Sequence, residues 1–409
     1  MIQRRIAISI LSIGCLSFVG ADWTQFRGPD NAGRTADSKL PPTKWSVEPG
    51  ADGSANVRWT AEVPARGVSG PIVVADRVIV TGASGPRQDR LHVACYSAAD
   101  GKQLWHRQYW ATGRTFCHPT SSVAANTPAS DGKRIFAFFS SNDLVCLDLD
   151  GNLLWYRGLT LEHPTSANDV GMAASPLVVG DVVVVQVESK GESFAAGIDV
   201  VTGATRWQTP RKSQMNWTSP TVFRSGTAEP LVLLQSPERL TAHHPATGEV
   251  AWSYDAVCGE ISSAAGDGDL ILLPSNGLTA LRSPVGSGNW EKVWQEAQLA
   301  PGNSSPVVKD GRVYVVNRAG AVACGEVATG KVLWRMRVKG PFWATPIAVG
   351  NLLYFVNAEG LAQVVKVDDA GGEVIAENDF REPVLGSPAC VDGAMYFRGE
   401  KHLWKIAQP

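Results

Sequence analysis

A small residue followed by proline, leading into an apolar strand, recurs along the 409-residue chain. The copies are Gly70-Pro71, Thr127-Pro128, Ser175-Pro176, Ser219-Pro220, Ser305-Pro306, Thr345-Pro346 and Ser387-Pro388, with Ser263-Ala264 as a degenerate eighth. Their second residues are separated by 57, 48, 44, 44, 42, 40 and 42 positions. A period of about forty residues is the mark of a repeat architecture, in which each unit packs on its neighbours. We therefore expect one repetitive domain, although the length alone would indicate two or three domains.

Each copy leads through the same series of strand and turn signals. An apolar strand such as 72–74 is followed by a turn rich in Asp, Gly or Asn, residues that tolerate the positive φ of hairpin turns. Two more strands follow, and the last turn is Thr-Gly or Asp-Gly before a tryptophan, most plainly in residues 328–334. Four short antiparallel strands per repeat, arranged radially, predict an all-β propeller.

The two ends of the chain predict that the ring is closed. The eighth repeat runs from Pro388 to Ile406 and provides only three strands. Residues 56–63 form an unassigned strand with Trp59 before the first repeat. We predict that this N-terminal strand completes the last blade, which makes residues 56–409 an eight-bladed propeller of four-stranded antiparallel blades. A linear solenoid is the alternative, but it would need capping repeats and would leave open edges.

Seven tryptophans stand at the ends of repeats. In the clearest copies the tryptophan follows the turn glycine by four residues, as Trp334 follows Gly330. A ring of this size buried between blades contributes on the order of 3–5 kcal/mol, the usual loss on Trp→Ala substitution. We therefore assign these side chains to structure and not to ligand stacking: Trp59, Trp105, Trp155, Trp207, Trp252, Trp294 and Trp334.

Residues 1–21 have the pattern of a secretory signal peptide. Arg4 and Arg5 form a basic start, residues 6–19 are mostly apolar, and small residues lead to a cleavage site after Ala21. The apolar run is shorter than the ~20 residues that a membrane span needs. We expect an exported protein of the periplasm or cell envelope, with no transmembrane segment.

A possible lipid anchor and an N-terminal extension lie near this signal. Cys15 is a candidate for a lipid anchor, but Ser12 stands where a leucine-like residue is expected. Residues 22–55 precede the first predicted strand and are assigned as an N-terminal extension.

The repeat ending D/A-x-x-T/D-G-x-x-x-W resembles the tryptophan-docking repeat of pyrroloquinoline-quinone (PQQ)-like eight-bladed propellers. The opening of the extension, residues 23–33 (WTQFRGPDNAG), resembles the start of exported PQQ-like repeat proteins of planctomycete-type bacteria. The resemblance covers residues 56–409 and implies the fold of the quinoprotein alcohol dehydrogenase-like superfamily. That group includes dehydrogenases and also a non-catalytic lipoprotein of the outer-membrane β-barrel assembly machine.

The charge balance excludes some partners. The chain has 37 basic and 39 acidic residues, a formal net charge of −2. This balance gives no electrostatic reason to expect nucleic acid or an anionic membrane surface as a partner. We expect a monomer that binds an envelope protein or a small ligand.

The loops before each small-Pro pair converge on the axis of a propeller, so their larger side chains are candidates for a ligand funnel. Two aromatic walls, a cation and an anion are among them, although the same residues could simply close the mouth of the ring. The candidates are Arg66, Asn126, Asn216, Trp217, Glu260, Asn303 and Trp343.

Two histidines on neighbouring blades make a candidate metal site. His118 and His163 begin similar His-Pro-Thr-Ser loops, with Asp169 and Cys117 nearby in the sequence. The spacing is not diagnostic, because His-Pro is also common in loops. His243 and His244 precede Pro245 in a turn and are both expected to be solvated.

Six cysteines follow the signal and match no zinc or disulfide framework. Buried unpaired thiols are the preferred interpretation. A disulfide between Cys117 and Cys258, both in loops, stays open.

The residues favour a non-catalytic exported scaffold or binding protein of the cell envelope, in a role such as outer-membrane protein assembly. A PQQ-dependent dehydrogenase is one alternative, and a carbohydrate-binding propeller is another. The resemblance implies that such a dehydrogenase has a calcium ion on the quinone, a tryptophan platform beneath it and a disulfide between adjacent cysteines. This chain has no Cys-Cys pair. Glu260, Asn303 and Asp169 are the only calcium ligands we can name, and Trp217 or Trp343 the only platform, so we expect no cofactor and no catalytic residue.

Overall fold

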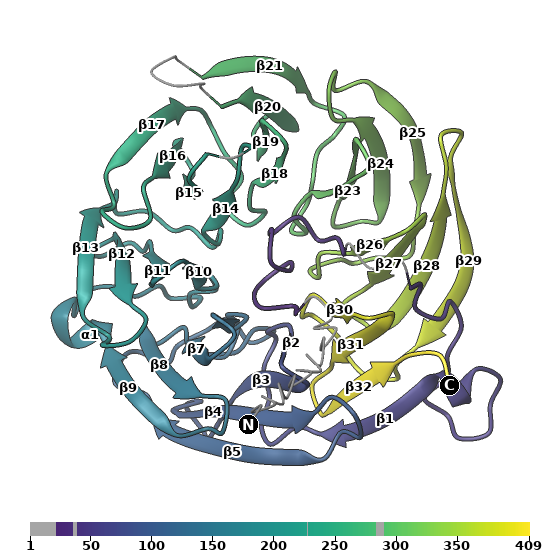
Figure 1. Cartoon of the computed structure of the whole chain (residues 1–409), viewed down its shortest axis with the longest axis horizontal. Coiled ribbons are helices and arrows are strands. Elements are labelled where there is room, and N and C mark those ends of the chain that lie inside the picture. The colour runs from purple at the N-terminus through teal and green to yellow at the C-terminus, as the bar shows by residue number, and fades with distance from the viewer. Residues whose placement is uncertain (1–21, 36–38, 227, 284–289) are drawn as a thin grey trace, which may run out of the picture.

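The computed structural model describes residues 22–35, 39–226, 228–283 and 290–409. Over these residues the chain forms eight four-stranded antiparallel sheets arranged as the blades of a ring (Figure 1). The predicted signal peptide and Cys15 lie outside the described residues. The predicted all-β eight-bladed propeller is confirmed.

The blades follow one another in chain order, and in the first seven the innermost strand comes first. Blades 1 to 4 contain β2 (Ile72–Val74), β3 (Arg77–Ser84), β4 (Arg90–Ser97), β5 (Gln103–Trp110); β6 (Ala129–Ser130), β7 (Arg134–Phe138), β8 (Asp143–Asp148), β9 (Leu153–Gly158); β10 (Leu177–Val179), β11 (Val182–Val187), β12 (Phe194–Asp199), β13 (Thr205–Pro210); β14 (Thr221–Phe223), β15 (Leu231–Ser236), β16 (Arg239–His243), β17 (Val250–Asp255). Blades 5 to 8 contain β18 (Ala265–Asp267), β19 (Leu270–Pro274), β20 (Leu278–Arg282), β21 (Glu291–Glu296); β22 (Val307–Lys309), β23 (Arg312–Val316), β24 (Ala321–Glu326), β25 (Val332–Arg337); β26 (Ile347–Val349), β27 (Leu352–Val356), β28 (Leu361–Val367), β29 (Gly372–Asp379); β30 (Ala389–Val391), β31 (Ala394–Arg398), β32 (His402–Ile406) and β1 (Val57–Glu62).

Strand β1 closes the ring from the other end of the chain. It pairs antiparallel with β32, with Trp59 opposite Lys405 and Glu62 opposite His402. The eighth blade therefore takes three strands from the C-terminus and its outermost strand from the N-terminal side, as predicted. This arrangement joins the two ends of the ring through a ladder of backbone hydrogen bonds.

Helices are confined to single turns, η1 (Ser54–Asn56) and α1 (Leu159–Glu162). Within the described ranges, no helix has the length and apolar character that a membrane span needs. The connections between blades lie on one face of the ring, here called the upper face. The first turn of each blade lies on the other, here called the lower face.

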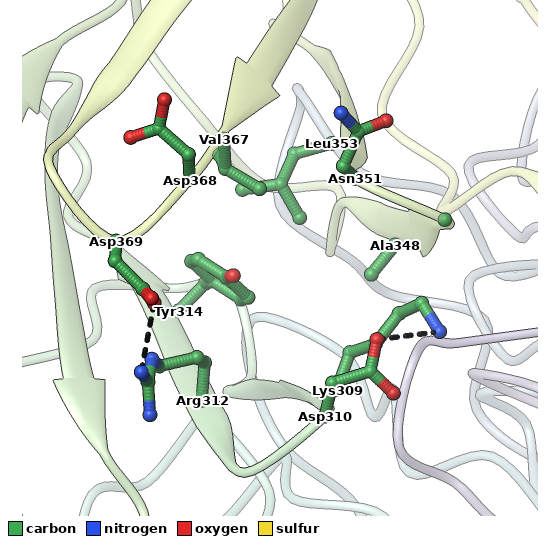
Figure 2. A pocket seen from close by; sticks show the side chains of 11 residues that line it. Lys309, Asp310, Arg312, Tyr314, Ala348, Asn351, Leu353, Val367, Asp368 and Asp369 are labelled. Carbon is green, nitrogen blue, oxygen red and sulfur yellow. Dashed lines mark hydrogen bonds and ion pairs between the residues drawn. The ribbon is translucent and has the colours of Figure 1, made fainter.

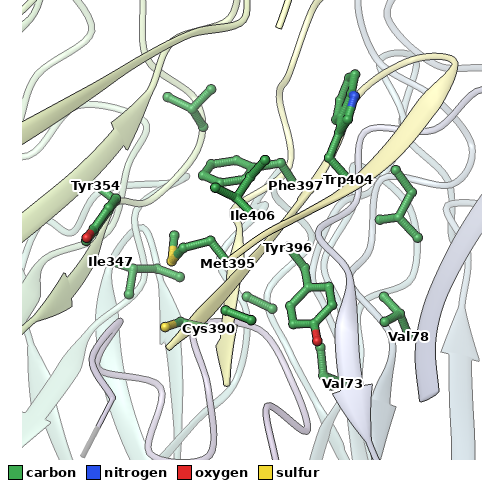
Figure 3. Packing of buried hydrophobic residues seen from close by; sticks show 14 of the residues in the cluster. Val73, Val78, Ile347, Tyr354, Cys390, Met395, Tyr396, Phe397, Trp404 and Ile406 are labelled. Atoms are coloured by element: carbon green, nitrogen blue, oxygen red, sulfur yellow. The ribbon is translucent and has the colours of Figure 1, made fainter. Parts of the chain in front are cut away.

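The core lies between blades, because each sheet is apolar on both sides. At the closing blade, Met395 and Tyr396 of β31 pack with Val73 of blade 1 and Ile347 of blade 7 (Figure 3). One hydrophobic cluster therefore joins blades 7, 8 and 1, where the ring is closed.

The repeat-ending tryptophans pack on the turn glycine of the next blade. At Gly248, where φ is +72°, an added Cβ would lie 2.4 Å from the Trp207 ring. The same stacking joins Trp59 to Gly101 and Trp294 to Gly330. Glycine is required there for two reasons, because φ is positive and the ring of the preceding blade occupies the space of a side chain.

For six of the seven docked rings, the indole N–H also donates to a carbonyl of the next blade. Trp207 Nε1 donates to Pro245 O at 2.7 Å and Trp105 Nε1 donates to Leu149 O at 2.9 Å. Trp59, Trp155, Trp294 and Trp334 make the corresponding bond. Trp252 Nε1 has no partner among the described residues. The six rings thus combine packing between blades with a directional contact.

Candidate functional site

A belt of hydroxyl groups surrounds the axis at the small-Pro pairs. The backbone N–H of each belt residue donates to the side-chain hydroxyl of the belt residue in the next blade, at 2.9–3.0 Å. The series runs through Gly70, Thr127, Ser175, Ser219, Ser263, Ser305, Thr345 and Ser387. The recurrence of Ser and Thr in the repeat therefore has a physical cause, which the sequence analysis did not identify.

The belt is interrupted at Gly70, which has no hydroxyl to accept from Ser387. A Cβ on Gly70 would lie 2.3 Å from Ser387 O, so no side chain fits there. The backbone of Ser387 thus occupies the space that a side chain on Gly70 would need.

A second layer of buried residues lies directly above the belt, at the position before each belt residue. Asn126 Nδ2 donates to Ala174 O at 2.6 Å, and Ser304 Oγ donates to Ala344 O at 2.8 Å. All eight positions of this layer are buried: Ser69, Asn126, Ala174, Thr218, Ser262, Ser304, Ala344 and Gly386. The axis is therefore closed on the side of the upper face.

The axis is filled below the belt by residues 22–35, here called the axial segment, drawn in purple at the centre of Figure 1. Innermost strands carry unpaired backbone N–H groups on the edge that faces the axis. The axial segment accepts hydrogen bonds from six of these strands: Val73 N to Trp23 O, Ser130 N to Thr24 O, Val178 N to Gln25 Oε1, Val222 N to Asn31 Oδ1, Val308 N to Ala32 O and Ala348 N to Gly33 O. The opening motif WTQFRGPDNAG, residues 23–33, therefore fills the axis of the ring. The sequence predicted no role for this motif.

Arg27 binds the fifth and sixth blades from the middle of the axial segment. Its guanidinium donates to Ala264 O at 2.6 Å and to Pro306 O at 3.5 Å, and the side chain is buried. Burial lowers the pKa of Arg27 to about 9, which leaves it charged at neutral pH, while Asp30 opposes the shift. A buried cation held by carbonyl dipoles is costly to leave unpaired, so these contacts fix the position of the segment.

Three of the predicted funnel residues are bound within the wall of the ring. Asn126 and Asn216 are buried, and Asn216 Nδ2 donates to Gln235 O at 2.7 Å. Arg66 pairs with Glu400, Nε to Oε1 at 3.0 Å, and also donates to Ser121 O. The cation of the predicted funnel is therefore paired with Glu400 and not with Glu260.

The two predicted aromatic walls differ in exposure. Trp217 is half-buried. Its indole N–H donates to Gly171 O at 3.0 Å, which joins the loop before β14 to the loop before β10 of the neighbouring blade. Trp343 is exposed, with the Arg318 guanidinium 5.7 Å from the centre of its ring.

Glu260 and Asn303 share a hollow of about 450 Å³ on the upper face, between blades 5 and 6. Cys258, Pro274 and Asn276 also line it. Of the predicted funnel residues, these two are the ones that the structure brings together in a cavity. A second hollow of about 290 Å³ lies on the lower face between blades 6 and 7 (Figure 2). Its charged residues pair among themselves, Arg312 with Asp369 at 2.8 Å and Lys309 with Asp310 at 3.1 Å.

The residues of the predicted metal site have separate partners. His163 Nδ1 lies 2.7 Å from Glu192 Oε1, Asp169 pairs with Arg114 at 3.0 Å, and His118 Nδ1 lies 2.8 Å from Thr120 Oγ1. Among the described residues, no group of three or more His, Cys, Asp or Glu is arranged to hold a metal ion.

A PQQ–calcium pair does not fit the described residues. Calcium takes six to eight oxygen ligands, whereas Asp169 binds Arg114 and only Glu260 and Asn303 share a cavity.

None of the six cysteines in the described part of the chain forms a disulfide. Burial raises the pKa of Cys258 to about 12, and it also raises the pKa of Cys117. A raised pKa keeps both thiols protonated near neutral pH, which disfavours the thiolate form.

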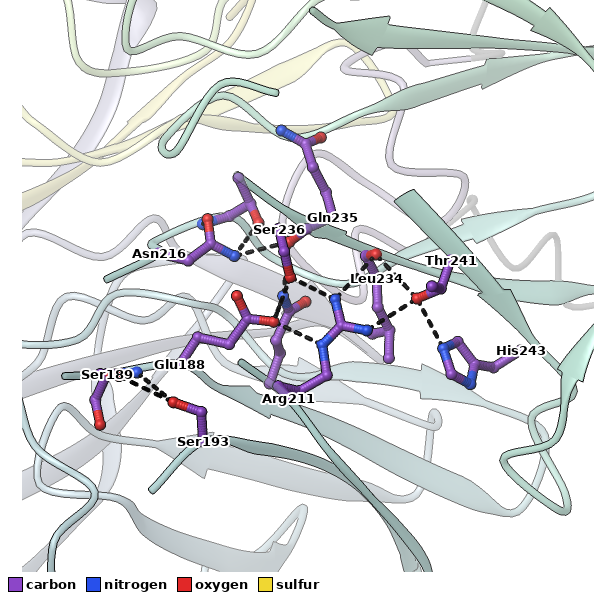
Figure 4. Close-up of polar contacts among 12 residues, drawn as sticks. Glu188, Ser189, Ser193, Arg211, Asn216, Leu234, Gln235, Ser236, Thr241 and His243 are labelled. Atoms are coloured by element: carbon purple, nitrogen blue, oxygen red, sulfur yellow. Dashed lines mark hydrogen bonds and ion pairs between the residues drawn. The ribbon is translucent and has the colours of Figure 1, made fainter. Parts of the chain in front are cut away.

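A buried ion pair links blades 3 and 4 (Figure 4). Glu188 Oε1 accepts from Arg211 Nε at 2.7 Å and from Ser236 Oγ at 2.6 Å. Arg211 continues to Thr241 Oγ1, which lies 2.8 Å from His243 Nε2. The expectation of a solvated pair is wrong for His243, because its ring is buried against Trp207 and bonds to Gly248 O. His244 is exposed, as expected.

A closed eight-bladed propeller with docked tryptophans and a filled axis defines the class of protein. The family model described as outer membrane protein assembly factor BamB matches residues 51–254 and 275–362, and the chain belongs to this PQQ-like propeller family. The tetrathionate hydrolase of Acidithiobacillus ferrooxidans is 22% identical over 377 residues, covering 81% of this chain and 71% of that protein.

Solved structures of BamB and of dehydrogenases share this fold. BamB from Moraxella catarrhalis is 16% identical with a TM-score of 0.62, covering 85% of this chain and 95% of that one. A europium-containing methanol dehydrogenase is 14% identical with a TM-score of 0.68, covering 92% and 89%. The quinohemoprotein alcohol dehydrogenase of Comamonas testosteroni is 13% identical with a TM-score of 0.68, covering 95% and 81%. At these identities the likeness establishes the fold alone.

Proposed function

We propose that this protein is an exported, non-catalytic scaffold of the cell envelope that binds a protein partner through its upper face. The observation that carries the proposal is the closed axis, with the hydroxyl belt and one fully buried layer of residues above and the axial segment below. The family description names an outer membrane assembly factor, which supports envelope protein assembly as the setting. The poor fit to a PQQ–calcium pair argues in the same direction.

The contact surface that we propose is a group of exposed apolar side chains on the upper face of blades 1 to 3. Trp110 is 60% exposed, Phe116 59% and Leu161 75%, and Val170 belongs to the same group. Their loops are neighbours, because His118 N donates to Val170 O and Tyr156 Oη donates to Trp110 O. Exposed apolar groups of this kind are typical of protein interaction sites.

Site-specific photo-crosslinking in the native cell envelope tests this function. A photoreactive residue at Phe116 should give a discrete crosslinked protein, whereas one at Val201, equally exposed on the lower face, should not. No crosslink at Phe116, or the same products at both positions, would contradict the proposal. Purified protein mixed with PQQ and Ca²⁺ provides the second arm, because dye-linked dehydrogenase activity would favour the enzyme instead.

A further inference from the structure

We propose that the axis of the ring is a binding site for a turn-forming, arginine-containing peptide, and that residues 22–35 are its resident ligand. The inference goes beyond the scaffold function and is independent of it. It rests on two observations. Hydrogen bonds within the axial segment fix much of its conformation, and the blades around the axis hold it through further contacts.

The segment has a compact conformation of its own. Gly28 N donates to Gln25 O, Asn31 N to Gly28 O, and Gly33 N to Arg27 O. Gly28 and Gly33 have φ of +82° and +68°. The ring of Trp23 packs on Gly28, where an added Cβ would lie 3.1 Å away. A short peptide with these local restraints loses less conformational entropy on binding than a fully flexible chain.

The walls of the site supply a matching set of groups. Six inward-facing N–H groups donate to the segment, and two carbonyls, of Ala264 and Pro306, accept from Arg27. Asp267 of β18 pairs with Arg34 at 2.9 Å, and Arg34 also pairs with Asp30 within the segment. Seven blades thus contact one segment of fourteen residues. We interpret the groups that these blades present as a recognition surface for the segment.

The blades do not need the segment to close the ring. Closure is made by β1, which begins at Val57, well after the end of the axial segment. The contacts of the segment with the blades are non-covalent, so its sequence should bind equally when supplied as a separate peptide. Covalent attachment then acts mainly by raising the effective concentration of the ligand.

The experiment uses the full chain with a protease recognition sequence inserted between Thr35 and Lys39. After cleavage, we expect the N-terminal fragment that contains residues 22–35 to co-elute with the propeller in size-exclusion chromatography. An excess of fluorescein-labelled peptide of residues 22–35 should then replace it with one-to-one stoichiometry. A scrambled peptide should not bind. A peptide with Arg27→Lys should bind at least about tenfold more weakly, because an ammonium group lacks the fork that bridges two carbonyls.

Release of the peptide on cleavage without rebinding would overturn the proposal, and so would a peptide that cannot be exchanged. A chain beginning at Lys39 gives an independent measurement. Its thermal midpoint should lie below that of the full chain and rise with added peptide but not with the scrambled one. If this shorter chain does not fold, the cleaved full-length protein decides the question alone.

Discussion

At the scale of single residues, the turn glycines are fixed by the neighbouring blade as well as by their own backbone. Gly248 and Gly311 have the same φ, +72°. An added Cβ at Gly248 would meet the Trp207 ring at 2.4 Å, whereas at Gly311 nothing lies within 4 Å. This pair separates the conformational cost of a side chain from its steric cost.

We predict that Gly311→Ala costs about 1 kcal/mol of unfolding free energy, the usual penalty for the left-handed conformation. Gly248→Ala should cost about 3 kcal/mol, because overpacking against the tryptophan is added to the same penalty. Urea unfolding of both variants measures the difference. Equal losses would show that the Trp207 contact has no energetic role.

Two histidines of blade 1, His92 buried and His106 half-buried, form a pair that should make stability depend on pH. His92 Nδ1 lies 2.8 Å from His106 Nε2, and His92 Nε2 lies 2.7 Å from Ser84 Oγ. Burial lowers the pKa of His92 to about 4, with His106 adding to the shift. Burial, and then Arg107, lowers the pKa of His106 as well. His92 is therefore neutral in the folded protein near pH 6, and His106 takes up a proton less readily than an ordinary imidazole.

Acid should destabilise the fold through this pair. The unfolded chain takes up protons near pH 6.5, the ordinary value, while folded His92 resists protonation until about pH 4. Stability is therefore lost as the pH falls from about 6.5 towards 4. The fall in thermal midpoint between pH 7.5 and pH 5 should be smaller in His92→Gln than in the natural chain. Replacement of the exposed His244 by Gln is the control and should leave that fall unchanged.

At the scale of elements, the hydroxyl belt connects strands that are far apart in the sequence. Each Ser or Thr of the belt satisfies a buried backbone N–H of the preceding blade, as Ser219 Oγ does for Ser175 N. The proline or alanine that follows leads into the innermost strand. The repeat therefore encodes a connection between blades as well as a strand start.

Ser219→Ala should cost about 1–3 kcal/mol, because the buried N–H of Ser175 loses its acceptor. Gly70→Ser restores the repeat pattern but should be destabilising too, since its Cβ would lie 2.3 Å from Ser387 O. Urea midpoints of the two variants measure both effects. A Gly70→Ser protein more stable than the natural chain would contradict this account of the interruption.

At the scale of the whole molecule, the N-terminal part performs two separate tasks. The axial segment fills the centre, and β1 closes the circumference by pairing with β32. The first satisfies the inward edges of the blades, and the second removes the free edge of the last one. The extension is thus part of the propeller and not an appendage to it.

Truncation separates the two tasks. A chain that starts at Asn56 lacks the axial segment but keeps β1, and we expect it to remain a monomeric ring. A chain that starts at Pro64 also lacks β1 and exposes the edge of β32, which should pair with other copies. Size-exclusion chromatography coupled to light scattering compares the two chains. Association of both, or of neither, would contradict the role given to β1.

The fold could be predicted almost completely, because the repeat expresses local rules of strand, turn and docked tryptophan. The site could not be predicted to the same extent. Arg66 and Glu260 are the cation and the anion of the predicted funnel, but Arg66 forms its ion pair with Glu400 of the last blade. His243 looked like a turn residue, but Trp207 of the preceding blade covers it. Both outcomes depend on contacts between blades, which a single repeat does not specify.

The sequence by itself determined the number of blades, their four strands, the closure by the strand of Trp59 and the burial of the repeat-ending tryptophans between blades. Each of these follows from the spacing of the repeats and from residue type. Only the tertiary structure decided that residues 22–35 enter the axis and that the hydroxyl groups form a belt. The physical reason is that the N–H groups facing the axis belong to different blades. Their acceptors become recognisable only when the ring has brought seven distant strands around one segment.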